Sequence, residues 1–280
     1  MRVSIAVPSR NHGRFLWRCL QSIATQDHAD FEVLIADGGS TDDSSEIIAG
    51  FVRQDGRFRL VSTSDAGQAD AVNRALREGT GDIACFLNAD DEYLERDVLR
   101  RIVNAFATHP DIDVVTCGGS YLDANGRRLR PVRLRYHPLD KFVGMRRRIA
   151  VLQPATFWRR AITARFPFRA DLHFAFDHLF FYQLLLEYRW LELPDRIAGY
   201  RLHGANKSLM ISSARVTELV ELEAVKYGAG TFRPAYLRLV ALVTGYADHL
   251  PRALQTPVKR LIYLIVNSLS FLTVYRLPGI

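Results

Sequence analysis

The chain has 280 residues, of which 48% are hydrophobic and 24% are charged; these ordinary values exclude a largely disordered protein and allow a sizeable core. The net charge of +7 is unevenly distributed, because residues 1–125 carry 12 basic and 20 acidic residues whereas residues 126–280 carry 25 basic and 10 acidic ones. The acidic part suits a bound cation and the basic part an anionic partner, but no RNP, zinc-finger or helix-turn-helix pattern is present, so no nucleic-acid partner is expected.

Three cysteines, Cys19, Cys85 and Cys117, lie in apolar stretches and form no CxxC pair. This pattern is typical of buried free thiols in a reducing compartment. The apolar run at the N-terminus is interrupted by Pro8 and is too short for a signal peptide. We therefore expect a cytoplasmic location.

Short β-rich runs alternate with helical patterns over the first 120 residues. The runs cover residues 3–7, 31–36, 59–62, 83–87 and 114–117. Between them, apolar side chains recur at helical spacing, as in Phe15, Leu16, Cys19, Leu20 and Ile23. Residues 40–43 are expected to cap the helix that follows them. This alternation predicts an α/β fold with a mostly parallel central sheet flanked by helices.

The pattern changes after residue 120. Residues 123–126 end in Asn-Gly and predict a hairpin, and the Arg-rich residues 127–149 are expected to be exposed and flexible. From about residue 212 only helical pattern remains. Residues 261–275 are mostly apolar and have basic flanks, but the run is shorter than the about 20 residues that span a bilayer. A helix packed on the domain and a helix on the membrane surface are the alternatives, and the flanks favour the surface.

Polar side chains follow two of the predicted strands, at the strand ends where open α/β sheets bind ligands. Asp37 follows the second strand and can accept a hydrogen bond from a nucleobase or a ribose, while the adjacent glycines let the backbone approach a ligand. A tight turn with a helix cap is the alternative. Residues 64–73 follow the third strand, where Asp65 has the alternative role of a helix N-terminal acid.

The strand over residues 83–87 is followed, three residues later, by two adjacent carboxylates, Asp90 and Asp91. Like charges pack poorly without a compensating cation, and hard divalent cations take carboxylates together with substrate phosphates. A metal that bridges a diphosphate also stabilises it as a leaving group. An acidic helix N-terminus is the alternative, because Glu95 and Asp97 follow, but the pattern favours a Mn²⁺ or Mg²⁺ site.

Four motifs together resemble the family 2 glycosyltransferases of the GT-A fold in their order and spacing. They are Val7-Pro8-Ser9-Arg10-Asn11, Ala36-Asp37-Gly38-Gly39-Ser40-Thr41-Asp42, Asp65-Ala66-Gly67-Gln68-Ala69-Asp70-Ala71 and Leu87-Asn88-Ala89-Asp90-Asp91. The resemblance covers about residues 1–210 and implies a GT-A domain. Residues 1–120 would bind the nucleotide-sugar, residues 121–210 the acceptor, and residues 211–280 would form a helical C-terminal extension that associates with a membrane.

The resemblance also assigns roles by position. It implies that the first loop lines the nucleotide pocket, that Asp37 contacts the base and that Asp65 lies near the base and ribose. The full set expected to bind the nucleotide-sugar is Pro8, Ser9, Arg10, Asn11, Asp37, Asp65, Gln68, Asn73, Asn88, Ala89, Asp90, Arg201, His203 and Lys207.

The metal motif of the family is usually Asp-x-Asp, whereas this chain has Asn88-Ala89-Asp90. By position, Asp90 matches the acid that holds the metal. Asn88 retains the capacity to bind a ribose hydroxyl or a water, and Asp91 is the candidate for the missing charge. Residues 200–208 resemble a loop that closes over the donor diphosphate, in which Arg201 and Lys207 can neutralise phosphate and His203 can contact the phosphate or the metal. A purely structural role is the alternative for His203.

On the acceptor side, residues 153–160 resemble a strand of the family, although core packing explains Trp158 equally well. Asp177 stands among aromatic residues, where desolvation raises the pKa of a carboxyl group and suits a general base. The resemblance places the catalytic base there. The second acid that the family often has two positions later is Leu179 in this chain.

These expectations describe a metal-dependent, inverting glycosyltransferase, peripheral at the inner face of an anionic membrane. It would move a sugar from a nucleotide-sugar to a sugar or lipid-linked sugar acceptor in cell-surface polysaccharide or glycolipid assembly. A UDP-sugar is the expected donor, with dTDP- and GDP-sugars as the alternatives. One alternative is a catalytically inactive GT-A-like module of a membrane polysaccharide complex, which Asn88 and Leu179 keep open. The other is a sugar nucleotidyltransferase, although residues 7–15 contain only Gly13 where that class needs a Gly-rich, basic loop.

Overall fold

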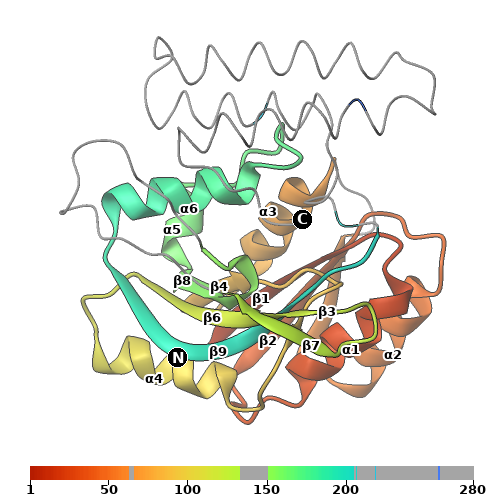
Figure 1. The fold of residues 1–280 in the computed structure, drawn as a ribbon, viewed down its shortest axis with the longest axis horizontal. Coiled ribbons are helices and arrows are strands. Elements are labelled where there is room, and N and C mark those ends of the chain that lie inside the picture. Colours follow the sequence, from red (N-terminus) through yellow and green to blue (C-terminus); the bar gives the residue numbers. More distant parts are fainter. Residues whose placement is uncertain (63–65, 133–150, 205, 207–217, 219–257, 259–280) are drawn as a thin grey trace. The chain divides into compact units, whose positions relative to one another are not determined.

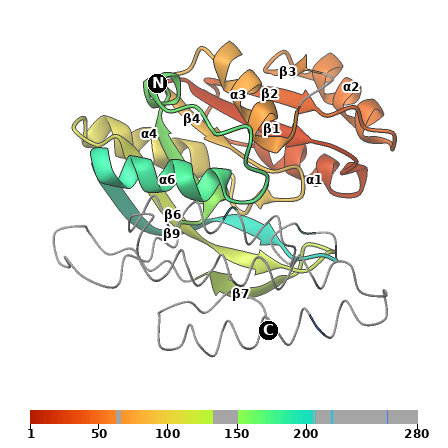
Figure 2. The same ribbon diagram turned by 90° about the horizontal axis from the view of Figure 1, so that it is seen from above.

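The computed structural model describes residues 1–62, 66–132, 151–204, 206, 218 and 258. The chain divides into two compact units, one of residues 1–171 and 176–203 and the other of residues 172–175 and 204–280. All helices and strands named below belong to the first unit (Figures 1 and 2). Asp65, Lys207, most of the Arg-rich segment and nearly all of the predicted C-terminal extension, including its apolar run, lie outside the described residues.

The first part of the sheet is parallel, with strands in the order β3-β2-β1-β4. These strands are β1 (Val3–Ser9), β2 (Phe31–Asp37), β3 (Phe58–Ser62) and β4 (Ile83–Phe86). Every residue of β1, β2 and β4 is buried, because helices cover both faces of the sheet. The strands begin close to the predicted positions. Because β1, β2 and β4 are parallel neighbours, their carboxyl ends lie at the same edge of the sheet.

Three amphipathic helices connect these strands: α1 (Gly13–Ala24), α2 (Ser44–Gln54) and α3 (Gln68–Glu78). A fourth amphipathic helix, α4 (Val98–Thr108), comes after them in the chain. Figure 1 shows α3 on one face of the parallel strands and α1 and α2 on the other. The predicted apolar face of α1 is buried in full. The carboxylate of Asp42 accepts hydrogen bonds from the N–H groups of Gly13 (2.9 Å) and Ser44 (3.1 Å), and so joins the starts of α1 and α2.

The second part of the sheet is mixed. Its strands are β5 (Glu92–Tyr93), β6 (Val114–Leu122), β7 (Arg128–Val132), β8 (Thr156–Arg159) and β9 (Trp190–Arg201), and the order continues from β4 as β8-β6-β9-β5. β8 is antiparallel to both neighbours, whereas β9 runs parallel to β6. The hairpin prediction is confirmed, with Gly126 at φ +88°. The expectation of a flexible segment from residue 127 was wrong for residues 128–132, which form β7 beside β6.

An aromatic cluster packs around Trp158 on β8. The Trp158 ring is fully buried and lies 5.1 Å from the ring of Phe180 and 5.9 Å from that of Phe181, both on α6 (Phe176–Glu187). Its indole N–H donates to the hydroxyl of Thr163 (2.9 Å) on the short helix α5 (Ala161–Arg165). Trp158 is therefore a core residue, in agreement with the packing alternative.

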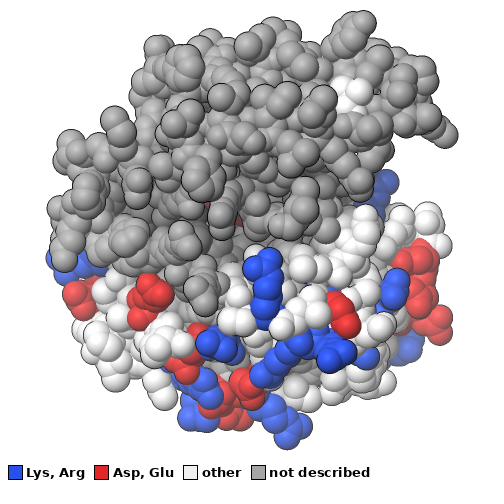
Figure 3. Space-filling model, in the orientation of Figure 1, with Lys and Arg blue, Asp and Glu red and all other residues white. Residues whose placement is uncertain are grey.

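The described part of the second unit centres on Glu218, which is 7% exposed. Its carboxylate accepts hydrogen bonds from the N–H groups of His173 (2.7 Å), Phe174 (2.7 Å) and Ala175 (2.9 Å). The helices that the structure describes include none with the length and apolar character needed to cross a bilayer. On the face shown in Figure 3, basic and acidic side chains of the described residues are intermixed.

Candidate active site

The loops that follow β1 and β2 are fastened to each other at the carboxyl edge of the sheet. Asn11 has a φ of 55°, a left-handed conformation that is uncommon for residues other than glycine. Its backbone N–H donates to Ser40 Oγ (2.8 Å), and its side-chain oxygen accepts from the N–H of Thr41 (2.8 Å). The Gly38 N–H also donates to the carbonyl of Ser9 (2.8 Å). Two of the predicted nucleotide-binding motifs thus form one continuous surface.

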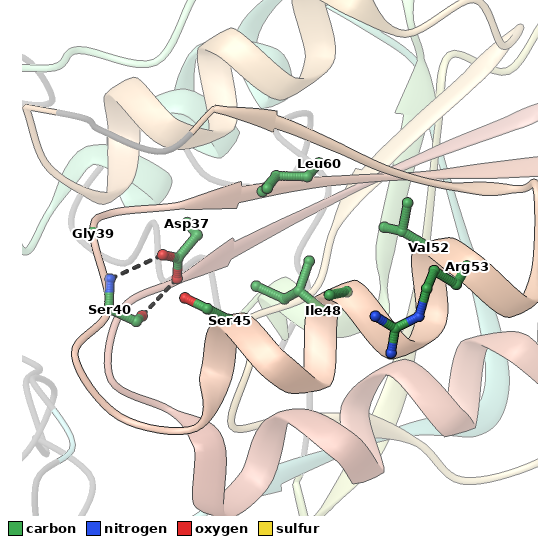
Figure 4. A pocket seen from close by; sticks show the side chains of 9 residues that line it. Asp37, Gly39, Ser40, Ser45, Ile48, Val52, Arg53 and Leu60 are labelled. Atoms are coloured by element: carbon green, nitrogen blue, oxygen red, sulfur yellow. Dashed lines mark hydrogen bonds between the residues drawn. The ribbon is translucent and has the colours of Figure 1, made fainter.

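Asp37 lies at the end of β2 and is 5% exposed. Its carboxylate accepts hydrogen bonds from the backbone N–H (2.9 Å) and the hydroxyl (2.5 Å) of Ser40 (Figure 4). A pocket of about 380 Å³ begins at Asp37 and Ser40 and continues between α2 and β3, where Ile48, Val52 and Leu60 line it and Arg53 stands at its far end (Figure 4). Asp90 and His203 are not among its lining residues, so the pocket does not include the acidic part of the site.

The acidic motif after β4 meets a histidine that follows β9. Nε2 of His203 lies 2.9 Å from Oδ2 of Asp90, and both side chains are largely buried, with 9% and 15% of their surfaces exposed. The ring of Phe15 on α1 packs 4.7 Å from the imidazole ring and holds it in place. The structure therefore brings together two of the three predicted metal ligands.

Asp91, the third predicted ligand, is 1% exposed. Burial raises the pKa of its carboxyl group well above the usual value, and the negative charge of Asp90 raises it further, against the opposing effects of the Arg201 N–H, the Arg201 guanidinium and the nearby Asn88 side-chain amide. Oδ1 accepts the Arg201 N–H (2.9 Å), whereas Oδ2 is a buried oxygen without a hydrogen-bond partner among the described residues. A buried carboxylate oxygen of this kind is the observation that best fits a nearby cation.

Arg201 is fully buried at the end of β9. Its guanidinium donates to the carboxylate of Glu92 (2.5 Å), to the carbonyl of Asp90 (2.8 Å) and to that of Asp123 (3.3 Å). The charge of Arg201 therefore compensates the acidic loop. Glu92 was not singled out from the sequence, because its ion pair depends on a strand more than a hundred residues away.

The residues present fit a divalent ion held in part by its substrate. Among the described residues no group of three or more His, Cys, Asp or Glu side chains has the arrangement of a metal site. The Asp90–His203 pair nevertheless supplies one carboxylate and one imidazole, and Mg²⁺ in particular is often held by one or two carboxylates together with substrate phosphates.

The predicted amide residues have different surroundings. Gln68 Nε2 donates to Asn88 Oδ1 (2.7 Å), which brings the third and fourth motifs together. Asn73 instead uses both ends of its amide on the main chain of Phe168, at 2.7 and 2.9 Å. Gln153, in the short 3-10 helix η2 (Gln153–Ala155), accepts a hydrogen bond from Asn88 Nδ2 (3.1 Å). Its place beside Asn88 was not foreseen, since nothing in the sequence pairs positions 88 and 153.

Among the other predicted binding residues, Ala89 is buried and Arg10 is exposed. Asp177, the predicted base, stands in the first turn of α6 and is partly exposed, with its Oδ1 accepting the N–H of His178 (2.7 Å). A carboxylate in this position is stabilised by the helix dipole. Its partial exposure leaves it accessible to an acceptor.

Comparisons with known proteins agree with this geometry. Residues 4–167, more than half of the chain, match the family model described as Glycosyl transferase family 2. An uncharacterized glycosyltransferase of Nostoc is 27% identical over 227 residues, 76% of this chain and 69% of that protein. A PGL/p-HBAD biosynthesis glycosyltransferase of Mycobacterium bovis is 39% identical over 113 residues, 40% of this chain and 44% of that protein. The match therefore spans less than half of the mycobacterial relative.

Two solved structures share the fold. Staphylococcus aureus TarS 1–349 in complex with UDP-GlcNAc superposes with a TM-score of 0.65 and 22% identity, over 89% of this chain and 72% of that one. The mannosyltransferase PcManGT from Pyrobaculum calidifontis, in complex with GDP-Man and Mn²⁺, superposes with a TM-score of 0.60 and 21% identity, over 95% of this chain and 75% of that one. The predicted α/β fold of the GT-A type is thereby confirmed.

Proposed function

Because the chain belongs to glycosyl transferase family 2, we propose that it transfers a sugar from a nucleotide-sugar to an acceptor hydroxyl with inversion at the anomeric carbon. The observation that carries this proposal is the Asp90–His203 pair, 2.9 Å apart, at the edge of the sheet where β1, β2 and β4 end. Ligands bind at this edge in open α/β sheets. A buried carboxylate and imidazole there suit a diphosphate with its counter-ion.

The donor nucleotide would lie along the surface formed by the first two loops. Asp37 would accept a hydrogen bond from the base. Asn11, which is hydrogen-bonded to Ser40 and Thr41, would keep the loop after β1 in its conformation. UDP is the first candidate, since the TarS structure contains UDP-GlcNAc; GDP is the second, since the PcManGT structure contains GDP-Man.

Asp90 and His203 are the residues that would hold Mn²⁺ or Mg²⁺ in this function. A divalent ion bound there neutralises the charge of the departing nucleoside diphosphate. Arg201 keeps the acidic loop in place through Glu92 and the Asp90 carbonyl. Asp90 and His203 would then have set positions before the donor binds, which is what electrostatic stabilisation of a leaving group requires.

Asp177 would act as the general base. It would take the proton of the acceptor hydroxyl while the hydroxyl oxygen forms a bond to the anomeric carbon, and the bond from that carbon to the diphosphate oxygen would break on the opposite side. The nucleoside diphosphate leaves with the bonding electrons. Base catalysis of this kind contributes about 10²- to 10⁴-fold in rate.

We further propose that the acceptor is a lipid-linked or cell-surface sugar and that the protein acts at the inner face of the membrane. The support is the sequence of residues 261–275, a mostly apolar run with basic flanks, which suits a helix on an anionic surface. The mycobacterial relative is named for PGL/p-HBAD biosynthesis. Co-sedimentation of the full chain with vesicles of phosphatidylcholine, with and without phosphatidylglycerol, tests this part: binding to neither would rule it out.

The experiment that tests the main proposal is thermal unfolding of the full chain with UDP, GDP or dTDP, each with and without Mn²⁺. A ligand that binds only the folded state raises the unfolding midpoint. We expect one nucleotide to raise the midpoint much more with Mn²⁺ than without it, and the corresponding nucleotide-sugar to be hydrolysed slowly. No stabilisation by any nucleotide at millimolar concentration would favour the inactive-module alternative instead.

A further inference from the structure

Three side-chain amides form a continuous hydrogen-bonded chain beside the acidic motif. Gln68 at the start of α3 donates from Nε2 to Asn88 Oδ1 (2.7 Å), and Asn88 donates from Nδ2 to Gln153 Oε1 (3.1 Å). Gln153, which is only 8% exposed, donates in turn from Nε2 to the main-chain carbonyl of Phe86. The amide chain, defined as Gln68, Asn88 and Gln153, thus connects α3, the end of β4 and η2.

The direction of every hydrogen bond in the amide chain is set at its buried end, where Gln153 meets the main-chain carbonyl of Phe86. The Phe86 carbonyl can only accept, so the NH₂ group of Gln153 must face it and Oε1 must face position 88. Position 88 must therefore present a donor to Gln153. The remaining atom of Asn88 is an acceptor, and Gln68 supplies the donor that it needs.

An ionised aspartate at position 88 would break this pattern, because both of its oxygens are acceptors. One carboxylate oxygen would stand against Gln153 Oε1, so two acceptors would meet at a largely buried position where neither has a donor. Leaving a buried polar group without its partner is more costly than the hydrogen bond itself is worth. Asparagine therefore fits the surroundings that the fold provides at this position, and aspartate does not.

The main chain near position 88 is also held on both sides. The Asn88 carbonyl accepts the N–H of Asp91 (2.9 Å), and the Leu87 N–H donates to the carbonyl of Ala6 on β1 (2.9 Å). The thiol of Cys19 on α1 also contacts the Asn88 carbonyl at 3.5 Å. These contacts fix the main chain at position 88, so its side chain starts from a set position beside Gln153, and Asp90 lies only two residues further along.

We propose that Asn88 is a positioning residue whose amide fastens the end of β4 between Gln68 and Gln153, and that the fold requires an uncharged donor and acceptor at this position. The consequence for the donor site rests on the function proposed above. In that function, Asp90 and His203 would hold the metal without a second carboxylate at position 88. Restoring the aspartate that an Asp-x-Asp motif would have is therefore expected to harm the site.

A double-mutant cycle tests the amide chain without any ligand. We expect Asn88→Asp to lower the unfolding midpoint at pH 7.5 by several degrees, and to lower it much less when Gln153→Ala has removed the opposing amide oxygen. Asn104→Asp, at an exposed position of α4, is the matched control for the added charge and should leave the midpoint nearly unchanged. An equal effect of Asn88→Asp in both backgrounds, or no effect in either, would overturn the proposal.

The second readout separates a positioning residue from a weakened metal ligand. The rise in unfolding midpoint caused by MnCl₂ with UDP should be smaller in Asn88→Asp than in the unchanged chain. A larger rise, together with an unchanged midpoint in buffer, would mean that aspartate at position 88 improves the metal site and would refute the proposal. If UDP with Mn²⁺ stabilises neither protein, the function proposed above fails, while the ligand-free cycle still decides the role of the amide chain.

A milder variant keeps the test decisive if Asn88→Asp does not fold. Gln68 is at the more exposed end of the amide chain, and Gln68→Glu replaces the donor that faces Asn88 Oδ1 by an acceptor. We expect a smaller loss of unfolding midpoint than for Asn88→Asp, and we expect Gln68→Glu to cost much less in an Asn88→Ala background, where the facing oxygen is absent, than in the unchanged chain; a recovery here means this smaller effect. The absence of that recovery would contradict the proposed direction of the hydrogen bonds.

Discussion

Nε2 of His203 lies 2.9 Å from Oδ2 of Asp90, although 113 positions separate the two residues in the sequence. A residue from the middle of the first unit and its last residue thus meet in one acidic site. The contact is supported on one side by the Phe15 ring, 4.7 Å from the imidazole.

Asp90→Asn is predicted to remove the Mn²⁺-dependent part of nucleotide binding. The amide keeps the shape of the side chain but loses the charge that attracts a cation, so turnover of the nucleotide-sugar should fall about 100-fold or more. Isothermal titration with UDP, with and without Mn²⁺, measures the binding loss. The control is Asp30→Asn, an exposed position; equal effects of the two substitutions would contradict the assignment of Asp90.

Asp177→Asn is predicted to lower kcat while leaving donor binding intact. An amide cannot take the acceptor proton, so kcat should fall by about 10²- to 10⁴-fold, with an unchanged rise in unfolding midpoint on addition of UDP and Mn²⁺. Asp171→Asn provides the comparison, because the Asp171 side chain is nearby in sequence and 63% exposed. Retention of full turnover in Asp177→Asn would exclude this residue as the base.

Arg201→Met is predicted to destabilise the fold strongly. Arg201 is fully buried and pairs with Glu92, and removing one partner of a buried ion pair costs about 3–5 kcal/mol because the other charge stays uncompensated. Urea unfolding measures the change. The matched control is Arg128→Met, whose pair with Glu95 is about half exposed on both sides and should be worth less than about 1 kcal/mol. A similar cost for both would argue against a structural role for Arg201.

Glu32→Gln is predicted to destabilise the fold in a pH-dependent way. Glu32 is 2% exposed; burial raises its pKa, but hydrogen bonds from the N–H of Thr80 (2.6 Å) and the hydroxyl of Ser4 (2.7 Å) outweigh burial and leave the pKa below its usual value. The folded protein therefore binds this proton less tightly than the unfolded chain does. The resulting stability is present above the unfolded-state pKa of about 4.3 and is lost as pH falls through the folded-state pKa.

The unfolding free energy of Glu32→Gln should accordingly be about 1–3 kcal/mol lower at pH 7, and the difference should shrink toward pH 3. Urea titrations at several pH values measure it. Glu78→Gln, at a side chain that is 48% exposed, should show little change across the same range. A difference that is constant with pH would mean that the charge of Glu32 contributes nothing.

Local pattern was sufficient for the first half of the fold. Alternating strands and helices predicted β1 to β4 and the buried face of α1, since burial periodicity is a property of neighbouring residues. The insertion of β8 antiparallel between β4 and β6 could not be predicted, because strand order depends on contacts between distant segments. The Arg-rich pattern of residues 128–132 likewise indicated a loop, but pairing with β6 made it a strand.

The same division applies to the site. Motif spacing identified Asp37 and Asp90 at strand ends, and their places agree with that prediction. The spacing carried no information on the direction of long side chains. Arg201 was expected to face a phosphate, yet its guanidinium binds Glu92 and main-chain carbonyls. A contact between Arg201 and the donor diphosphate stays a prediction.

β9 is the last described strand in the chain, but it is inserted between β6 and β5 rather than at an edge of the sheet. During synthesis, Asp91 and Glu92 leave the ribosome long before Arg201 can compensate them. At typical translation rates the interval from residue 93 to residue 201 is roughly 5–20 s. Until β9 is made, the edge of β6 that pairs with it has unpaired backbone groups, which can capture other chains. We expect a holdase chaperone that covers this edge of β6 during synthesis to raise the yield of native protein. The gain should exceed the gain obtained by slowing the refolding of the finished chain.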